Sequence, residues 1–339
     1  MIKHADIVIG LSYGDEGKGK VVNSLLKQNK YTHCVRYNGG HNAGHTIHKE
    51  NKIFSTHVIP TGYLQDVQPV IGPGCVVSPR LLEEEYEHLV TRGFKGKKKI
   101  FIDKRTNIIS SEHLNEDSNE VSIGTTRRGN GPAYRDKYAR KNMRFGDFKH
   151  WNQDFIEVID IYGELHGDKE CEVLMEGAQA FGLDIDWGDY PFVTSSHCTT
   201  AGALLNGIPP KALNEVWGVM KCYETYVGAK KFELNNPVFS KIRTIGKEYG
   251  ATTGRPRQVS WTDMNLVSNA ILVNGVTHVV INKMDVLDEV GTWNVFDQDG
   301  QVNVLNNQEG FQNYFLNFLK DEFPTEGINT HFSSSPEMI

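Results

Sequence analysis

Long hydrophobic runs, paired cysteines and an excess of positive charge are all missing from this 339-residue sequence. No apolar run approaches the roughly 18 residues that a membrane-spanning helix needs, so we expect no contact with a membrane. The five cysteines are scattered and form no C-x-x-C pair, which argues against a disulfide framework and a thiolate zinc site. Lys and Arg total 36 against 42 Asp and Glu, which is unfavourable for coating nucleic acid. We expect a protein of the reducing cytoplasm without nucleic acid as a partner.

Internal repeats, low-complexity tracts and Pro- or Ser-rich linkers are also missing, so we expect one elaborated domain over residues 1–339. The composition, 39% hydrophobic and 23% charged, excludes disordered and fibrous classes. Several apolar runs are continuous, as in strands buried on both faces of a parallel sheet. The predicted fold class is therefore α/β, with a mostly parallel central sheet flanked by helices. Strands are expected at residues 5–11, 32–37, 69–72, 99–103, 172–175, 216–222 and 277–282, helices at 18–30, 79–92, 153–166, 261–274 and 309–322, and a hairpin at 293–296 and 301–305.

The first predicted strand runs into a glycine-rich loop at residues 14–20 (GDEGKGK). Glycines after a buried strand let backbone N–H groups approach an anion at the next helix N-terminus, and a lysine adds a point charge. The loop is not a Walker A motif, because Gly19 stands where that motif has its magnesium-binding hydroxyl. Asp15 is therefore the candidate within the loop for a Mg²⁺ ligand or a base. A solvated glycine-rich connector is the alternative reading.

Small residues, hydroxyls and hydrogen-bonding side chains gather in five further segments. Residues 38–45 (NGGHNAGH) follow a predicted strand, so they belong at the carboxyl edge of the sheet, where open α/β folds bind ligands. Their two histidines lack a carboxylate or cysteine at ligand spacing, which favours phosphate binding and acid catalysis over zinc. Arginines in residues 124–132 and 250–257 suit bidentate capture of phosphate or carboxylate, although the first segment alone also fits an exposed basic loop. The last two segments are residues 176–180 (EGAQA) and 190–196 (YPFVTSS).

The predicted strand at 277–282 ends in residues 282–285 (NKMD). This is the N-K-x-D pattern with which GTPases read guanine, where the carboxylate accepts from N1–H and the 2-amino group. Four residues match by chance often, but the place of the pattern after an apolar strand, in a chain with a phosphate loop, favours a purine nucleotide. A regulatory GTPase is the alternative that this motif raises, and the missing Walker hydroxyl argues against it.

Taken in order, these segments resemble the adenylosuccinate synthetase family. That family joins L-aspartate to C6 of a purine 5′-monophosphate at the expense of a purine triphosphate. The resemblance extends from residue 14 to residue 288 and returns near the C-terminus. It implies the fold of that family, which is similar to P-loop nucleotide-binding folds without a true Walker A loop. It also implies a 6-phosphoryl intermediate, made by attack of O6 on the γ-phosphorus after N1 loses its proton, from which the amine of aspartate displaces phosphate.

The resemblance assigns roles to individual residues. Asp15 would be the base at N1 and would bind Mg²⁺ together with the carbonyl of Gly44, and His45 would be the acid at the departing β-phosphate. The residues implied for the donor nucleotide are Gly14, Glu16, Gly17, Lys18, Gly19, Asn282, Lys283, Asp285, Ser333 and Ser335. Those implied for the monophosphate are Asn42, Thr126, Gln179 and Thr194, with Arg140 reaching the 5′-phosphate in the neighbouring subunit of a homodimer. Those implied for L-aspartate are Arg128, Thr252, Thr253, Arg255 and Arg257.

Several segments depart from the family's usual pattern. Residues 230–233 (KKFE) replace a Pro-Phe-Pro-Thr-Glu segment, Tyr226 replaces an arginine, and residues 195–199 (SSHCT) replace Ser-Ser-Asn-Thr-Thr. Residues 333–337 lack the usual glycine before proline, so ATP or dATP joins GTP as a candidate donor. Together with features of the segment between residues 207 and 216, these departures favour the phage branch, which uses dGMP to make the succinylated precursor of 2-aminoadenine. Some phage members have serine in place of Asp15, so the retained aspartate supports IMP as the alternative substrate.

Overall fold

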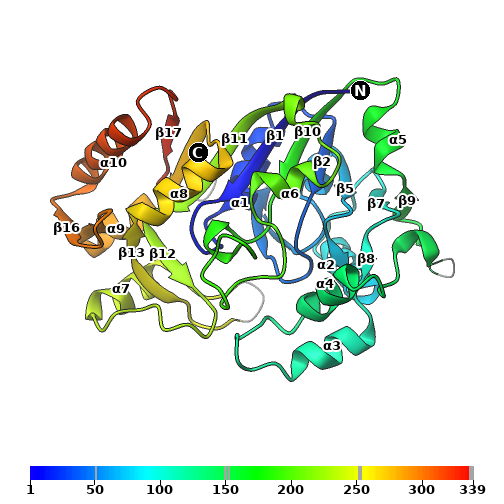
Figure 1. The fold of residues 1–339 in the computed structure, drawn as a ribbon, viewed down its shortest axis with the longest axis horizontal. Helices are drawn as coiled ribbons and strands as arrows, with labels where there is room; N and C mark the ends of the chain where they lie inside the picture. Colours follow the sequence, from blue (N-terminus) through cyan, green and yellow to red (C-terminus); the bar gives the residue numbers. More distant parts are fainter. Residues whose placement is uncertain (50–51, 149–150, 152, 251–253, 336–339) are drawn as a thin grey trace.

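The structure, a computed structural model, describes residues 1–49, 52–148, 151, 153–250 and 254–335. Within these ranges a nine-stranded sheet in the order β17-β14-β11-β1-β10-β2-β5-β7-β9 runs through the centre (Figure 1), and all its neighbouring strands are parallel. The predicted mostly parallel α/β architecture is confirmed. The strands of this sheet are β1 (Ile2–Gly10), β2 (His33–Arg36), β5 (Gln68–Ile71), β7 (Ile100–Asp103), β9 (Ile156–Ile159), β10 (Cys171–Glu176), β11 (Leu213–Lys221), β14 (His278–Asn282) and β17 (Asn329–Phe332).

Both faces of the central sheet are covered, which explains its continuous apolar strands. On β1, Ile7 and Ile9 belong to the same core cluster as residues of α8 (Met264–Asn274). Val8, pointing to the opposite face, belongs to a second cluster with residues of α1 (Lys18–Leu26). Because successive residues of a strand point to opposite faces, β1 is apolar on both.

Smaller sheets and further helices surround the central sheet. In Figure 1 the helices α3, α4 and α7 lie in the lower part of the view, together with the strands β12 and β13. None of the helices in the described ranges is both long and apolar enough to span a membrane. The remaining strands are β12 (Tyr223–Tyr226), β13 (Gln258–Asp263), β15 (Trp293–Phe296) and β16 (Val302–Leu305) in one sheet, the pair β3 (His45–Lys49) and β4 (Lys52–Thr56), and the pair β6 (Val76–Val77) and β8 (Asn107–Ile108). The remaining α-helices in the described ranges are α2 (Pro79–Thr91), α3 (Ser111–Ser118), α4 (Asn130–Tyr138), α5 (Ile161–His166), α6 (Thr200–Leu204), α7 (Pro237–Gly246), α9 (Met284–Val290) and α10 (Gln308–Glu322).

Three predicted helix boundaries are wrong, whereas the hairpin formed by β15 and β16 is confirmed. The start of the predicted helix 153–166 contains the edge strand β9, and α5 begins only after Asp160. The predicted helix 261–274 likewise starts inside β13, and α8 begins only after Asp263. Both aspartates accept hydrogen bonds from N–H groups of the first helical turn, so each is an N-cap that separates a strand from a helix. α1 ends at Leu26 rather than at residue 30.

Shortening a buried side chain of β1 should destabilise the whole sheet. Ile7 is fully buried, and we expect Ile7→Ala to lower the free energy of unfolding by about 2–5 kcal/mol, because the surrounding core refills the cavity only partly. Urea unfolding followed by circular dichroism measures the change. Leu272→Ala is the control, because Leu272 lies on α8 with 64% of its surface exposed and should change stability by less than about 0.5 kcal/mol. Equal losses in both variants would contradict the assignment of Ile7 to the core.

Candidate active site

Four predicted segments follow β1, β2, β10 and β14 and therefore lie at the carboxyl edge of the central sheet. β1 lies between β10 and β11, and the chain leaves it through α1 to reach β2 on the far side of β10. Ligands bind outside open α/β sheets at such a switch point. Gly19 at the start of α1 is so close to His45 that a Cβ added to it would be 2.9 Å from that of His45. The phosphate loop and the His45 segment therefore border the same space.

Glu16 holds the loop after β1 in shape. Its buried carboxylate accepts hydrogen bonds from the N–H groups of Ser12 (3.2 Å) and Gly14 (2.9 Å) and pairs with Lys18 at 2.6 Å. The loop turns through a left-handed backbone at Gly17, with φ 96°, directly before α1. Backbone N–H groups at the start of α1 thus face the loop, which is the arrangement that binds phosphate at helix N-termini.

Asn282, at the end of β14, supports the same loop, and Lys283 follows it. The side-chain amide of Asn282 donates to the carbonyl of Glu16 (2.7 Å), and a Cβ added to Gly17 would be 2.8 Å from that nitrogen. The other side-chain atom of Asn282, Oδ1, is buried and has no partner within the described residues. Lys283 donates to the carbonyl of Gly246 (2.9 Å). Asn282 therefore offers an acceptor while fixing the phosphate loop.

Lys20 joins the loop to the end of the described chain. Its ammonium donates to Ser333 Oγ (2.7 Å) and to the carbonyl of Ser335 (2.9 Å), two residues predicted for the donor nucleotide. Burial lowers the pKa of Lys20 to about 8, against the attraction of the Asp285 carboxylate, another predicted donor residue. Lys20 itself is not among the predicted site residues, although it lies in the loop that was singled out.

His45 lies in a buried cluster with Glu176 and Arg36. Nδ1 of His45 is 2.5 Å from Glu176 Oε1, and Arg36 Nη1 is 3.2 Å from Nε2. Burial and the charge of Arg36 lower the pKa of His45 to about 4, against the opposing effect of Glu176. Although burial would raise it, Arg36, His45 and the backbone of Thr61 lower the pKa of Glu176 to about 2. The ring is therefore neutral at pH 7, and Glu176, to which sequence reasoning gave no role of its own, orients it.

Asp15 faces Arg257 across the site. The Asp15 Oδ2 is 2.8 Å from Arg257 Nη2, and Arg257 also pairs with Glu248, a carboxylate with no exposed surface. Glu248 pairs in turn with Lys221 (3.2 Å) and accepts from the hydroxyl of Tyr223 (2.6 Å). Although burial would raise it, Lys221 and Arg257 lower the pKa of Glu248 to about 2. The predicted base and a predicted aspartate-binding arginine are thus in direct contact, and a buried network holds the arginine.

The remaining residues predicted for L-aspartate lie on two loops. Arg255 Nη1 is 3.5 Å from the carbonyl of Gly124, at the start of the loop that carries Thr126 and Arg128. A Cβ added to Gly124 would be 3.0 Å from the backbone nitrogen of Ala229, so this loop also contacts the segment that follows β12. The predicted residues at positions 252 and 253 (Thr252 and Thr253) lie outside the described residues.

Asn42 and Gln179 converge at Gly39. The Oδ1 of Asn42 accepts from the N–H of Gly40 (3.2 Å) and from the side-chain amide of Asn130 (2.7 Å). A Cβ added to Gly39 would be 2.9 Å from Gln179 Oε1 and 3.5 Å from Asn42 Oδ1. Gln179 Oε1 is buried and has no partner within the described residues. Two predicted monophosphate residues therefore share one small space that contains an unused acceptor.

The other predicted monophosphate residues and the predicted metal ligand Gly44 occupy different places. Thr194 donates its backbone N–H to the carbonyl of Leu183 (2.8 Å), and a Cβ added to Gly14 would be 3.7 Å from the side chain of Leu183. The Thr194 segment therefore borders the phosphate loop. Gly44 directly precedes β3. Arg140 is exposed just beyond α4, on the surface of the chain.

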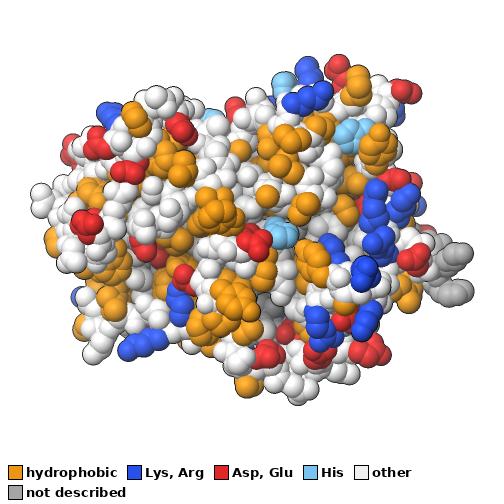
Figure 2. Space-filling model, viewed as in Figure 1, with side chains coloured by type: hydrophobic (Ala, Val, Ile, Leu, Met, Phe, Trp, Pro, Cys, Tyr) orange, Lys and Arg blue, Asp and Glu red, His pale blue; other side chains and the backbone are white. Residues whose placement is uncertain are grey.

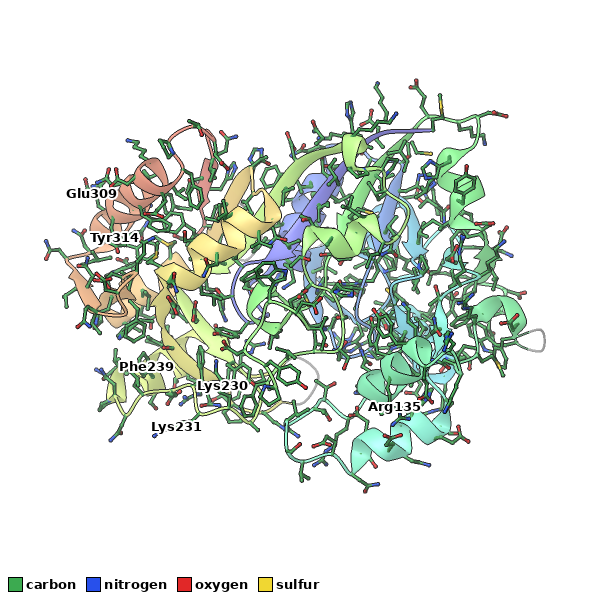
Figure 3. The ribbon with its side chains drawn as sticks, viewed as in Figure 1. Arg135, Lys230, Lys231, Phe239, Glu309 and Tyr314 are labelled. Carbon is green, nitrogen blue, oxygen red and sulfur yellow. The ribbon has the colours of Figure 1, made fainter. Side chains whose placement is uncertain are left out.

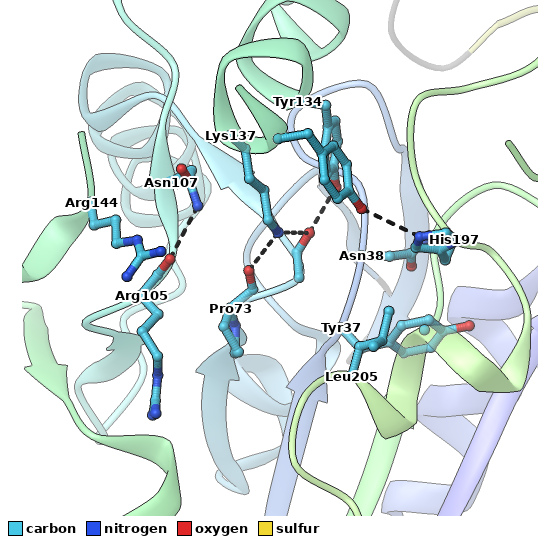
Figure 4. A pocket seen from close by; sticks show the side chains of 13 residues that line it. Tyr37, Asn38, Pro73, Arg105, Asn107, Tyr134, Lys137, Arg144, His197 and Leu205 are labelled. Carbon is cyan, nitrogen blue, oxygen red and sulfur yellow. Dashed lines mark hydrogen bonds between the residues drawn. The ribbon is translucent and has the colours of Figure 1, made fainter. Parts of the chain in front are cut away.

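A pocket of about 310 Å³ opens beside residues 38–45 (Figure 4). Asn38 lines one side, and Lys137 of α4 donates across its floor to the carbonyl of Pro73 (2.9 Å). Tyr138 and His197 also line the pocket, with the Tyr138 hydroxyl 3.3 Å from His197 Nε2, and Figure 4 shows His197 next to Asn38. Its lining includes none of the predicted site residues.

Comparisons with known proteins agree on one family. The sequence matches the family model described as adenylosuccinate synthetase over residues 7–167 and 158–302. It is 38% identical to the adenylosuccinate synthetase of Helicobacter pylori (strain Shi470) over 337 residues, covering 84% of this chain and 80% of the relative. It is also 38% identical to the enzyme of Aquifex aeolicus (strain VF5) over 349 residues, covering 87% of this chain and 80% of the relative.

Two solved structures share the fold. The fully ligated adenylosuccinate synthetase from Plasmodium falciparum aligns with a TM-score of 0.83 at 27% identity, over 98% of this chain and 97% of that chain. The succinoaminodeoxyadenylate synthetase of cyanophage S-2L, bound to dGMP and to dATP as an energy donor, aligns with a TM-score of 0.75 over 99% and 94%. Its 20% identity supports likeness of fold alone.

The buried His41 should make stability depend on pH. Its Nε2 accepts the N–H of Ser78 (3.1 Å), and burial, with His57 and Arg128 nearby, lowers its pKa from 6.5 to about 3. Between these values the unfolded chain holds a proton that the folded protein lacks, so the free energy of unfolding falls as the pH is lowered, by at most roughly 1.4 kcal/mol per pH unit. Urea unfolding between pH 7 and pH 5 should show a shallower fall for His41→Asn than for the wild type. Equal slopes would rule out His41 as a source of the dependence.

Proposed function

Because the chain belongs to the adenylosuccinate synthetase family, we propose that the residues at the carboxyl edge of its central sheet perform that family's reaction. The protein is a C–N bond-forming ligase of this family. The observation that carries the proposal is the 2.8 Å contact between Asp15 and Arg257, which joins the phosphate loop to the segment predicted to bind a carboxylate. N1 and C6 are adjacent atoms of the purine, so a base at N1 and the site of the amino acid that attacks C6 must be near each other.

Asp15 is proposed to remove the N1 proton of the 6-oxopurine, so that O6 can attack the γ-phosphorus of the triphosphate. Arg257, fixed by Glu248, holds the Asp15 carboxylate in one orientation before the reaction. The new O6–P bond forms as the bond between the γ-phosphorus and the bridging oxygen breaks. The amine of L-aspartate then attacks C6 and phosphate leaves. Arg255 is proposed to pair with an aspartate carboxylate through its guanidinium fork. Arg257 is proposed to reach the substrate through Nε, which has no partner within the described residues, because its two other nitrogens face Glu248 and Asp15.

His45 is proposed to donate a proton to the departing β-phosphate. In this structure its Nδ1 faces Glu176 and its Nε2 faces Arg36. A phosphate oxygen is therefore proposed to replace Arg36 as the partner of Nε2. A phosphate beside Nε2 would raise the pKa of His45 from about 4, because negative charge favours the imidazolium. With the triphosphate bound, His45 would therefore take up a proton from solvent, which it later donates.

Magnesium ions prefer oxygen ligands, and the residues of the site offer them. Asp15 has a carboxylate in the loop. Gly44 directly precedes His45, whose side chain approaches Gly19 of that loop, and its carbonyl is proposed as a second ligand. Mg²⁺ bound there would neutralise phosphate charge. Asp184, Asp186 and His197 form another group of potential ligands, but both carboxylate oxygens of Asp184 already accept backbone N–H groups, so we assign that group a structural role.

A homodimer in the cytoplasm is proposed as the working form, with one domain per chain. Arg140 is exposed beyond α4 and would complete the monophosphate site of a second copy. Tyr138, Met143 and Leu205 are large apolar side chains exposed around the same pocket and α4. Figure 2 shows hydrophobic side chains beside Lys and Arg side chains over this part of the surface. A second copy of the chain could bury this apolar patch and use the Arg140 guanidinium to bind its 5′-phosphate.

We propose dGMP as the preferred monophosphate and ATP, dATP or GTP as the donor. Lys230 and Tyr226, which depart from the family's usual pattern, contact Tyr13 beside Asp15, and this supports a change in one wall of the proposed site. The unused acceptor Gln179 Oε1 suits an exocyclic amino group. The phage enzyme of the same fold binds dGMP and dATP. The retained Asp15 and the relatives with ordinary adenylosuccinate synthetase names keep IMP as the alternative.

Product formation should require monophosphate, triphosphate, Mg²⁺ and L-aspartate together. Phosphate release and mass spectrometry of the nucleotide product measure it, and kcat/KM for dGMP should exceed that for IMP, because acceptors placed for a 2-amino group stay unpaired with the analogue that lacks it. Equal or better use of IMP would instead indicate an ordinary adenylosuccinate synthetase. Appreciable release from triphosphate alone would support the regulatory GTPase reading instead.

Asp15→Asn should lower kcat by a factor on the order of 10²–10⁴, because an amide cannot remove the N1 proton. Circular dichroism should show an intact fold, since Asp15 lies in a loop at the edge of the sheet. Asp299→Asn, in the exposed turn of the β15–β16 hairpin, is the matched control and should keep the wild-type rate. An Asp15→Asn enzyme with near wild-type turnover would exclude Asp15 as the base.

A further inference from the structure

Lys230 occupies a cage of three aromatic rings (Figure 3 labels the residue at the lower edge of the structure). Its ammonium lies 4.6 Å from the ring centre of Tyr13, 5.2 Å from that of Phe232 and 5.5 Å from that of Tyr226. The rings also contact one another, since Tyr13 meets Phe232 at 5.1 Å and Tyr226 at 5.8 Å, both edge to face. A cation over ring faces is attracted by their quadrupoles, more strongly where water is displaced. Only 22% of the Lys230 side chain is exposed.

Polar contacts fix the same ammonium. Lys230 forms an ion pair with Asp189, and the hydroxyl of Tyr13 donates to Asp189 Oδ2 (2.8 Å). The Lys230 ammonium is also 3.5 Å from the Tyr13 hydroxyl oxygen. The segments that carry Tyr13, Asp189 and Lys230 are far apart in the sequence and meet at the Lys230 ammonium. Tyr13 contributes a ring and a hydroxyl, and Asp189 contributes a carboxylate.

Each of these segments leads directly into the proposed site. Tyr13 stands two positions before Asp15, and Asp189 five positions before Thr194. Ala229, which precedes Lys230, donates its N–H to Ile123 (3.1 Å), at the start of the loop that carries Thr126. A shift of this junction would move the proposed base and monophosphate contacts relative to each other.

Building on the proposed function, we propose that Lys230 is a positioning residue that sets the geometry between the Asp15 loop and the monophosphate site. The lysine contacts the rings of Tyr13, Tyr226 and Phe232 and the carboxylate of Asp189, and none of these residues is proposed to react with a substrate. Lys230 fixes the segments that carry the proposed site residues. Its loss would leave Asp189 without its cation and would remove the cation that lies over the ring of Tyr13.

Steady-state kinetics on the full chain test this proposal through three variants. Lys230→Met keeps the length of the side chain and removes the charge, and we expect kcat to fall about 10–100-fold with the KM for triphosphate within about threefold, as for a misplacement of about 1 Å. Lys230→Arg keeps the cation for the rings and for Asp189 and should restore most of the rate. Lys231→Met removes a neighbouring exposed lysine and is the control that should match the wild type.

Hydrogen exchange separates failure of this proposal from failure of the proposed function. Amides of residues 11–17 and 182–195 should exchange faster in Lys230→Met than in the wild type, whether or not the enzyme makes the expected product, and Lys230→Arg should protect them again. Unchanged exchange in both segments, or kcat in Lys230→Met within about twofold of the wild type, would overturn the positioning role. So would a rate loss in Lys230→Met that Lys230→Arg shares in full. Absence of ligase product from the wild type would instead refute the proposed reaction.

Discussion

The buried carboxylate of Glu248 is the constraint on which the site depends. It has no exposed surface, so its charge must be matched by Lys221 at the end of β11 and by Arg257. Removing either partner would leave an uncompensated buried charge, which is far more costly than the net value of the pair. The direction in which Arg257 points is therefore set by the interior. Because Arg257 meets Asp15, the orientation of the phosphate loop is linked to the same buried charge.

A second buried carboxylate, Glu176, does the same for His45. It ends β10 and is saturated by the backbone and hydroxyl of Thr61 as well as by the imidazole and by Arg36. Each acid holds one predicted catalytic residue, Glu176 directly and Glu248 through Arg257. Full pairing of buried charges gives a site with few alternative rotamers, which is the preorganisation that proton transfer and phosphoryl transfer need.

Much of the fold and the location of the site could be predicted from the sequence, because continuous apolar runs and glycine-rich segments after them are local signals. The predictions for β1, β2 and β14, and for the loops that follow them, came from such runs. The strand-to-helix boundaries near Asp160 and Asp263 were missed because an apolar strand followed by an amphipathic helix resembles one longer helix. Contacts between distant segments have no local signal.

Those distant contacts account for the site residues that sequence reasoning missed. Glu176 was noticed in a motif without a role, and Lys20 was noticed in the loop without its partners at Ser333 and Ser335. Glu248 and Asp189 carry no local pattern at all. Their roles appear only when folding brings each acid next to a lysine that is distant in the sequence. The roles of the predicted residues in the reaction stay predictions, because the structure describes their positions only.

The position of β1 in the sheet has a consequence for biosynthesis. This strand is synthesised well before its two neighbours, β10 and β11, which belong to residues 171–221. Until those residues are translated, both edges of the apolar strand β1 lack a partner strand. The segments synthesised in between then fold without the centre of the sheet. Such long sequence separation slows folding and leaves edges that can pair with other chains. The same topology that creates the ligand-binding switch point therefore makes the nascent chain dependent on protection from aggregation during translation.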